Sequence, residues 1–220
     1  MAAQTSYAEL SDAARAVHLD IAGAFFPTAD DGCPDDTQTL VLLSPLEPGF
    51  WATFSTSPER SDGVAEPLDR WSKRVIGQLA KDHAGEALFP FGGPPYQPFL
   101  RWASLSGRAW GSPVGLLVHD TAGLFISFRD ALALRTRLDI PAAPESSPCR
   151  TCATRPCIAA CPVGALGQQG YDVPACRAYI SGKSGADCVD NGCAVRRACP
   201  VSQSYGRLPE QSAFHMRAFR

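Results

Sequence analysis

The sequence lacks any long hydrophobic run. Its longest apolar stretches are shorter than about ten residues, whereas a membrane-spanning helix needs about twenty. The first twenty residues also lack a basic patch followed by an apolar stretch, which a secretory signal would show. We therefore expect a cytoplasmic protein without a membrane partner.

The motifs of several common enzyme classes are absent as well. There is no G-x-x-x-x-G-K-[ST] phosphate loop, no G-x-G-x-x-G after a strand, and no evident Ser–His–Asp or paired-carboxylate pattern. The four histidines are scattered, and only His119, at the end of a predicted strand, is a candidate for a metal or cofactor role. A lone histidine there is more often a surface or hydrogen-bonding residue. No catalytic residue is assigned, and whether the chain is an enzyme stays open.

The chain has 220 residues, of which 45% are apolar and 19% charged, as in ordinary globular proteins. Charge is uneven: residues 1–148 carry a net charge of −7, and residues 149–220 carry +5. The basic part could bind nucleic acid, or its cations could compensate a negatively charged, thiolate-ligated cluster. Because the basic residues are scattered among cysteines, compensation is the favoured interpretation.

Hydrophobic spacing predicts helices over residues 6–16, 67–82 and 100–105, with Gly85 as the cap of the second. It predicts strands over 17–26 and 39–44, and a β-hairpin whose arms are 114–119 and 123–128. The segment 89–99, FPFGGPPYQPF, is too rich in Pro and Gly for a regular element. It either lines a pocket for a planar cofactor or is a packed loop.

These patterns predict an α/β (α+β) fold in two domains. An N-terminal mixed-sheet domain covers residues 1–138, and residues 139–148 form a Pro-rich linker. Residues 149–220 form a small cysteine-rich domain with too little apolar sequence for a large core. We expect an inorganic centre to organise it.

Eight of the nine cysteines lie between residues 149 and 199, and only Cys33 is isolated. Disulfides are disfavoured in a reducing compartment. The first run reads C-x2-C-x4-C-x3-C-P, which differs from the bacterial two-cluster ferredoxin run by two inserted residues. Eight thiolates meet the requirement of two [4Fe–4S] clusters. Zinc is an alternative, but zinc ribbons usually have two C-x2-C knuckles and this chain has one; free or disulfide-bonded cysteines are the remaining possibility.

In that bacterial pattern the fourth cysteine ligates the other cluster. A helical turn from Cys157 to Cys161, about 6 Å long, would bridge two clusters in the same way. By this symmetry, the first cluster is assigned to Cys149, Cys152, Cys157 and Cys199, and the second to Cys161, Cys176, Cys188 and Cys193.

The residues around these ligands have expected roles too. Pro162 and Pro200, which follow Cys161 and Cys199, should bend the chain away from each cluster and leave neighbouring amides free to donate to sulfur. Arg196 and Arg197 would stabilise the reduced clusters by charge or dock an acidic partner.

Three stretches, PCRTCATRPCIAACPVGAL (148–166), ACRAYIS (175–181) and GCAVRRACP (192–200), resemble the ferredoxin-like module of the epoxyqueuosine reductase and reductive dehalogenase family. Upstream, WGSPVGLLVHDTAGLFISFRDALAL (110–134) is similar to the stretch that joins the corrinoid-binding domain to the clusters. The resemblance implies a nitroreductase-like, corrinoid-binding first domain and a two-cluster ferredoxin-like second domain. It also implies clusters that feed electrons to cobalt for reduction of an epoxide on a tRNA nucleoside.

The catalytic part of this resemblance has no residue-level match. The stretch 92–108 holds no counterpart of the family's proton-donating aspartate, and Asp120 and Asp130 lie elsewhere. A corrinoid and a nucleic-acid partner are therefore implied by the resemblance alone.

Three functions remain open. The favoured one is one-electron transfer by two [4Fe–4S] clusters to or from a redox partner protein. The second is a reductase whose first domain holds a corrinoid or another cofactor. The third is a binding module in which the clusters are structural.

Overall fold

The chain crosses three times between two structural units in the computed structural model, which describes residues 5–167 and 169–220. One unit contains the residues up to Arg108 together with Ser127–Ala143. The other contains Ala109–Ile126 together with Pro144–Arg220. The segment Ala109–Ile126, which the sequence analysis places in the first domain, thus belongs with the cysteine-rich part of the chain.

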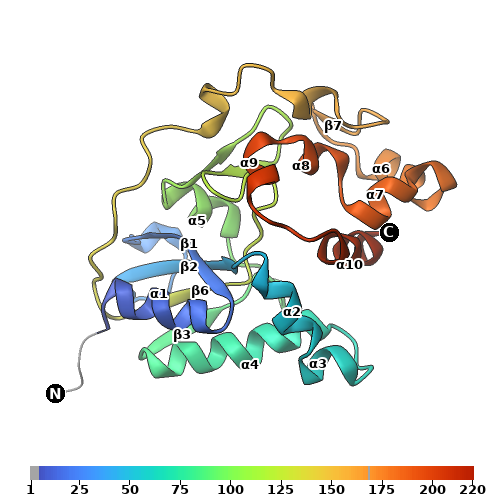
Figure 1. Ribbon diagram of the computed structural model, residues 1–220. Helices are drawn as coiled ribbons and strands as arrows, with labels where there is room; N and C mark the ends of the chain where they lie inside the picture. The colour runs from blue at the N-terminus through green and yellow to red at the C-terminus, as the bar shows by residue number, and fades with distance from the viewer. Residues whose placement is uncertain (1–4, 168) are drawn as a thin grey trace. The chain divides into compact units, whose positions relative to one another are not determined.

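A four-stranded sheet forms the centre of the first unit (Figure 1). Its strand order is β1-β2-β6-β3, and every described pairing is antiparallel, so the expected mixed sheet is wrong. The chain returns from β1 directly to its neighbour β2, and parallel neighbours would need a crossover connection. The strands are β1 Leu19–Phe25, β2 Thr39–Pro45, β3 Gly85–Leu88 and β6 Asp130–Leu134.

Both strands predicted in this unit, over residues 17–26 and 39–44, are confirmed as β1 and β2. The central strands β2 and β6 are buried at every position. A strand covered on both faces reads as a continuous apolar run, which explains the TLVLLS pattern. The overall class is therefore mixed α and β with an antiparallel sheet.

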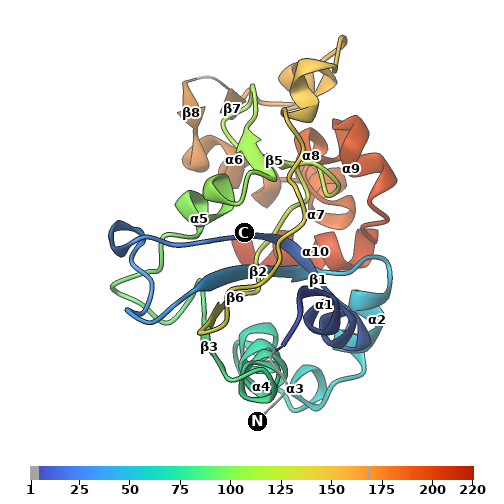
Figure 2. The same ribbon diagram turned by 90° about the vertical axis from the view of Figure 1, so that its left-hand side faces the viewer.

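Helices α1 Tyr7–Ala16 and α4 Pro67–Asp82 lie on one face of this sheet, and α5 Phe99–Leu105 lies on the other (Figures 1 and 2). All three predicted helices are confirmed. Helix α1 begins where the side chain of Ser6 accepts a hydrogen bond from Glu9 N at 3.2 Å, as an N-cap residue does. Two short helices, α2 Gly49–Ser55 and α3 Pro58–Ser61, precede α4 and were not predicted.

The predicted cap at Gly85 is wrong. Helix α4 ends at Asp82, and the amide of its C-cap residue His83 donates to Leu79 O at 3.2 Å. Ala84 then takes a left-handed conformation with φ +50°. Gly85 instead begins β3, where it pairs with Leu134.

Of the predicted hairpin over residues 114–128, a single antiparallel bridge forms between His119 and Gly123, whose amides each donate to the other's carbonyl oxygen at 3.0 Å. Strand β5 Leu117–His119 pairs with β4 Ala109–Gly111, and residues 123–128 form no strand. The reason is that the backbone of Leu124 is bonded elsewhere: its amide donates to Ser202 Oγ at 2.8 Å, and Arg196 Nη1 donates to its carbonyl oxygen at 2.6 Å. The segment is tied to the helices Ala194–Ala198 and Pro200–Ser204, which lie on either side of Cys199.

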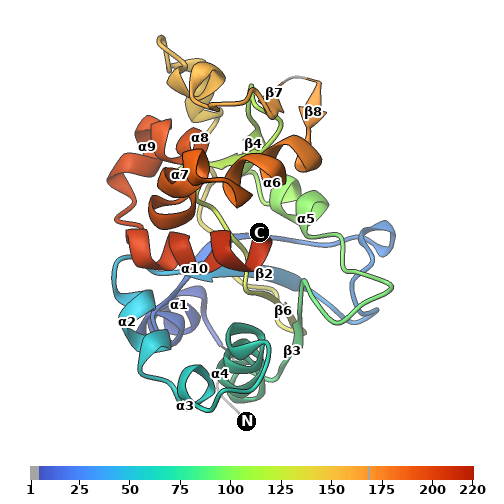
Figure 3. The same ribbon diagram turned by 90° about the vertical axis from the view of Figure 1, so that its right-hand side faces the viewer.

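The second unit is built from short elements around two small apolar clusters that include cysteines (Figure 3). Its last helix, α10, packs against α7. Besides β4 and β5, its elements are the 3₁₀ helices η2 Pro148–Arg150, η3 Pro156–Ala159 and η4 Lys183–Gly185, the strands β7 Leu166–Gly167 and β8 Gly170–Tyr171, and the helices α6 Val173–Ser181, α7 Ala186–Asn191, α8 Ala194–Ala198, α9 Pro200–Ser204 and α10 Pro209–Phe219. Across residues 5–167 and 169–220, no helix has the length and apolar character that crossing a bilayer requires.

Candidate metal centre

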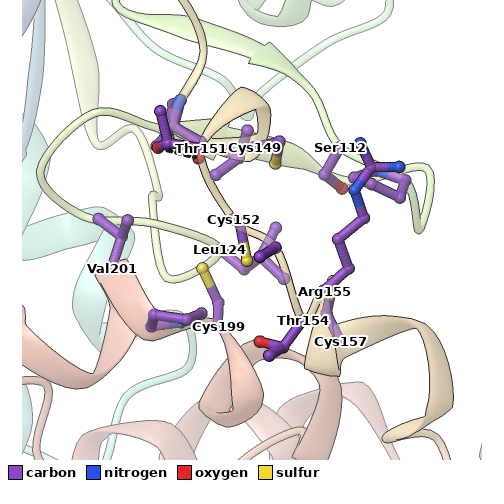
Figure 4. Close-up of a pocket in the computed structure, with 15 residues that line it drawn as sticks. Ser112, Leu124, Cys149, Thr151, Cys152, Thr154, Arg155, Cys157, Cys199 and Val201 are labelled. Atoms are coloured by element: carbon purple, nitrogen blue, oxygen red, sulfur yellow. Dashed lines mark hydrogen bonds between the residues drawn. The ribbon is translucent and has the colours of Figure 1, made fainter.

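Four thiols line a cavity of about 370 Å³ in the second unit (Figure 4). They belong to Cys149, Cys152, Cys157 and Cys199, the set that the spacing assigns to the first cluster. Figure 4 shows Cys149, Cys152 and Cys157, from one stretch of the chain, around the cavity together with Cys199 from a distant stretch. The rest of the wall is mostly apolar and includes Val118, Leu124 and Val201.

Local backbone structure turns these thiols toward the cavity. Ser147 caps η2 by accepting a hydrogen bond from Cys149 N at 3.2 Å. Arg155 adopts a left-handed conformation, φ +40° and ψ +53°, which reverses the chain before η3 and returns Cys157 to the wall. Cys199 is extended, and Pro200 follows it as the first residue of α9, a position that suits the fixed φ of proline.

A second cavity, of about 20 Å³, is lined by the other four thiols, Cys161, Cys176, Cys188 and Cys193. Its remaining wall includes Tyr179, Ile180 and Met216. Cys176 lies in α6 and Cys188 in α7, while Cys161 follows η3 and Cys193 precedes α8. The eight cysteines therefore divide four and four in the way that the sequence predicts.

Two short segments connect the cavities. The first carries Cys157 in η3 and Cys161 just beyond it, and the second is α8, with Cys193 and Cys199 at its two ends. Each segment gives one thiol to each cavity, and η3 packs against α8. The turn after Cys157 is a 3₁₀ helix rather than the expected α-helical turn, because Ala160 N donates to Cys157 O, three residues back.

A backbone amide donates to the sulfur of Cys161. Ala165 N lies 3.2 Å from Cys161 Sγ. The intervening Gly164 has φ +64°, a conformation that favours glycine and lets the chain fold back over the sulfur. This is the kind of contact expected beyond a Cys-Pro pair, since Pro162 has no amide proton to offer.

Burial dominates the electrostatics of the thiols. It raises the pKa of Cys149, Cys157 and Cys188, since a thiolate is disfavoured away from water. Burial likewise lowers the pKa of Arg196, while the nearby Cys193 and Tyr171 side chains, when ionised, oppose that shift. A cation is thus held beside the second cavity.

Among the described residues, Arg197, unlike Arg196, forms an ion pair with a carboxylate. It forms an ion pair with Asp187 and donates from Nε to Gly192 O at 3.0 Å. A compensating role is expected for both arginines. Within the described part of the chain, Arg197 is paired with a carboxylate and Arg196 is not.

Each cavity offers four thiols, a donor set that both zinc and iron–sulfur clusters accept. A tetrahedral Zn²⁺ site holds its sulfurs about 2.3 Å from the metal and so within about 4 Å of one another. Among the described residues, no group of three or more Cys, His, Asp or Glu is arranged to hold a single metal ion. The first cavity fits a larger group by both volume and donors. At the second, the fit rests on its donors alone, four thiols without a lining carboxylate or imidazole.

The other sequence candidates are placed outside these cavities. Cys33 lies in the first unit, where burial, reinforced by Asp31, raises its pKa to about 11. His119 ends β5, and its Nδ1 lies within 3.3 Å of the amides of Thr121 and Ala122 and 2.9 Å from Asp120 Oδ1. These contacts give His119 a hydrogen-bonding role in the turn that follows it.

The segment 89–98 has no helix or strand, as predicted, and no residue of it lines either cavity. Phe89 and Phe91 pack with ring centroids 5.1 Å apart, and the Lys73 ammonium lies 5.6 Å from the Phe91 ring centroid. These contacts match the packed-loop interpretation.

Two buried polar groups were missed by the sequence analysis as site candidates. Ser112 Oγ and both carboxyl oxygens of Asp130 have no hydrogen-bond partner in the described part of the chain. Ser112 lines the first cavity. Asp130 lies in β6 of the first unit, where burial raises its pKa well above the usual range despite the charge of Arg129. No spacing rule marks either residue.

Comparison of the chain with protein-family models, with curated proteins and with solved structures gives no match. Function is therefore argued from the two four-cysteine cavities.

Proposed function

We propose that the protein binds two [4Fe–4S] clusters, one at each four-cysteine cavity, and transfers single electrons between redox partners. The observation that carries this proposal is the interlaced division of the eight thiols. Two segments, η3 with Cys161 and α8 with its flanking cysteines, each contribute to both cavities. Such interlacing matches the two-cluster ferredoxin pattern, in which the fourth cysteine of a run ligates the other cluster.

Such clusters supply reversible one-electron chemistry at potentials set by hydrogen bonds to sulfur, net charge and burial. In this chain the eight thiols would hold them as thiolates, since coordination to a metal outweighs the raised pKa of a buried cysteine. The Ala165 amide at Cys161 Sγ and the Arg196 guanidinium near Cys193 both stabilise added negative charge. The shared segments keep the two sites adjacent, which electron transfer between them requires.

In this proposal the second unit is a two-cluster ferredoxin-like domain of a cytoplasmic protein. A nitroreductase-like, corrinoid-binding first unit is suggested only by the sequence resemblance, as is a nucleic-acid partner. The expected partner is a redox protein. Arg150 and Arg155 are exposed beside the first cavity, and residues 146–171 contain no acidic side chain, so an acidic partner surface is favoured.

Anaerobic purification followed by iron and sulfide analysis tests the proposal. Roughly eight irons and eight sulfides per chain are expected for two four-iron clusters, with a broad absorption near about 400 nm. Stoichiometric zinc and a colourless protein would overturn it.

The absorption spectrum and a redox assay distinguish the reductase and the structural module from the proposed electron-transfer protein. Resolved bands at longer wavelength would indicate the reductase, because a corrinoid or flavin adds them. Clusters that reduce with dithionite but exchange no electron with any redox protein would indicate a structural role.

A further inference from the structure

Ser112 is a buried hydroxyl on the wall of the first cavity. Its Oγ is shielded from solvent and has no hydrogen-bond partner among the described residues. Figure 4 shows Ser112 together with the four cysteines that line the same cavity. Buried hydroxyls are nearly always hydrogen-bonded, so an unpaired one calls for an explanation.

The backbone holds Ser112 in place. Its amide donates to Leu116 O at 2.9 Å, and its carbonyl oxygen accepts from Gly115 N at 3.1 Å. These bonds fix the turn between β4 and β5, and β5 packs against η2, which carries Cys149. The backbone groups of Ser112 are therefore hydrogen-bonded, whereas its side-chain hydroxyl has no hydrogen-bond partner among the described residues.

The other groups on this wall leave few acceptors for a hydroxyl proton. Most of the lining is carbon, from residues such as Pro113, Val118 and Leu124. The Arg155 side chain offers only donors. The hydroxyls of Thr151 and Thr154 can accept, but among the described residues Ser112 Oγ forms no hydrogen bond to either. Sulfur is thus the acceptor that the wall concentrates, through four cysteines.

We propose that Ser112 Oγ donates a hydrogen bond to a sulfur of the first cluster and thereby raises its reduction potential. This inference rests on the proposed function. A donor to sulfur stabilises the reduced state more than the oxidised state, because the reduced cluster carries one more negative charge. Ser112 is a positioning and tuning residue rather than a ligand, and among the described residues no serine or threonine lines the second cavity.

The test is an EPR-monitored redox titration of the full chain with Ser112→Ala. In the alanine variant, the equilibrium constant for reduction of the first cluster should fall by about threefold to tenfold. For a one-electron couple, this lowers the reduction potential by about 30–60 mV. The second cluster is the internal control, and its potential should not move. A Ser112→Thr variant keeps the hydroxyl and should restore the potential, whereas Thr154→Val removes an exposed hydroxyl at the same cavity and should change little.

Unchanged potentials in Ser112→Ala, equal shifts of both clusters, or a threonine variant that behaves like alanine would overturn the inference. If the alanine variant binds its first cluster poorly, electron–nuclear double resonance of the wild type in H₂O and D₂O tests for the hydrogen bond directly. The wild type should show an exchangeable proton coupled to the first cluster that Ser112→Thr retains, and its absence would count against the hydrogen bond. A wild-type protein without any cluster would contradict the proposed function itself.

Discussion

Replacing Cys157 and Cys161 one at a time by serine tests how the ligands are divided. These cysteines are four residues apart, yet Cys157 lines only the first cavity and Cys161 only the second. Each variant therefore leaves one set of four thiols complete and reduces the other set to three. A division by position along the chain would instead place both in one cluster, because they belong to the same C-x2-C-x4-C-x3-C-P run.

The expected magnitude is the loss of one cluster per variant, from roughly eight irons to roughly four. Cys157 is 7% exposed and belongs to an apolar cluster with Val118, Leu124 and Val195. A serine there also buries a hydroxyl, at a cost of about 1–3 kcal/mol. The Cys157→Ser variant should thus be the less stable of the pair, and its second cluster should remain in part.

Iron and sulfide analysis of anaerobic protein, with EPR of the dithionite-reduced state, is the assay. The wild type should show two interacting spins, and each variant should show one isolated cluster, with a different spectrum in the two variants. Cys33→Ser, which changes a thiol of the first unit, should keep the full iron content. Complete loss of iron in both variants while circular dichroism remains native, or identical residual spectra, would refute the proposed division.

Three further predictions concern stability, pH and docking. Ser6→Ala should lower the free energy of unfolding by about 1 kcal/mol in urea titrations, because Ser6 caps α1; Ser11→Ala in the same helix is the control, and an equal loss there would contradict the role of the cap. Burial raises the pKa of Asp130, so the folded chain holds that proton to higher pH than the unfolded chain does, and stability falls as pH rises above about 4. In the wild type, this group lowers the free energy of unfolding by up to about 1.4 kcal/mol per pH unit, and Asp130→Asn should abolish that contribution. Urea unfolding from pH 5 to 8 measures it, and the same pH dependence in both proteins would contradict the prediction. Replacing both exposed arginines beside the first cavity, Arg150 and Arg155, by Glu should slow electron exchange with an acidic flavodoxin about tenfold at low salt and less at high salt in stopped-flow measurements; the same effect from Lys183→Glu would argue against a local docking site.

Local signals explain which parts of the fold could be predicted. Helix α1 has a capping residue and buries Leu10 and Ala14 on one face, and β2 is a continuous apolar run. Strand β6, DALAL, was not predicted: it is short, it lacks β-branched residues, and its partner β2 is distant in sequence. The predicted hairpin is limited to one bridge for the same reason, because the hydrogen bonds that hold Leu124 come from residues beyond 190.

The candidate site could likewise be predicted only in part from the sequence. The two sets of thiols follow from cysteine spacing and the crossover rule, both of which can be read along the chain. Ser112 could not be found in that way, since a serine in a turn carries no signal until folding buries its hydroxyl beside four cysteines. The protein part of a metal site is recognisable in sequence mainly through its ligands, whereas the groups that adjust the metal depend on packing.

The segment Ala109–Ile126 makes the two cavities unequal. It supplies Ser112, Val118 and Leu124 to the wall of the first cavity and nothing to the second, whose lining lies entirely between Cys161 and Met216. The stretch from Pro144 onward therefore holds all eight clustered thiols but only one complete cavity. Because Ala109–Ile126 is joined at both ends to the first unit, no single cut in the chain separates the α/β unit from a second unit that keeps both cavities complete. The first unit is thus tied by chain connectivity to the cavity at which an external partner is expected to dock.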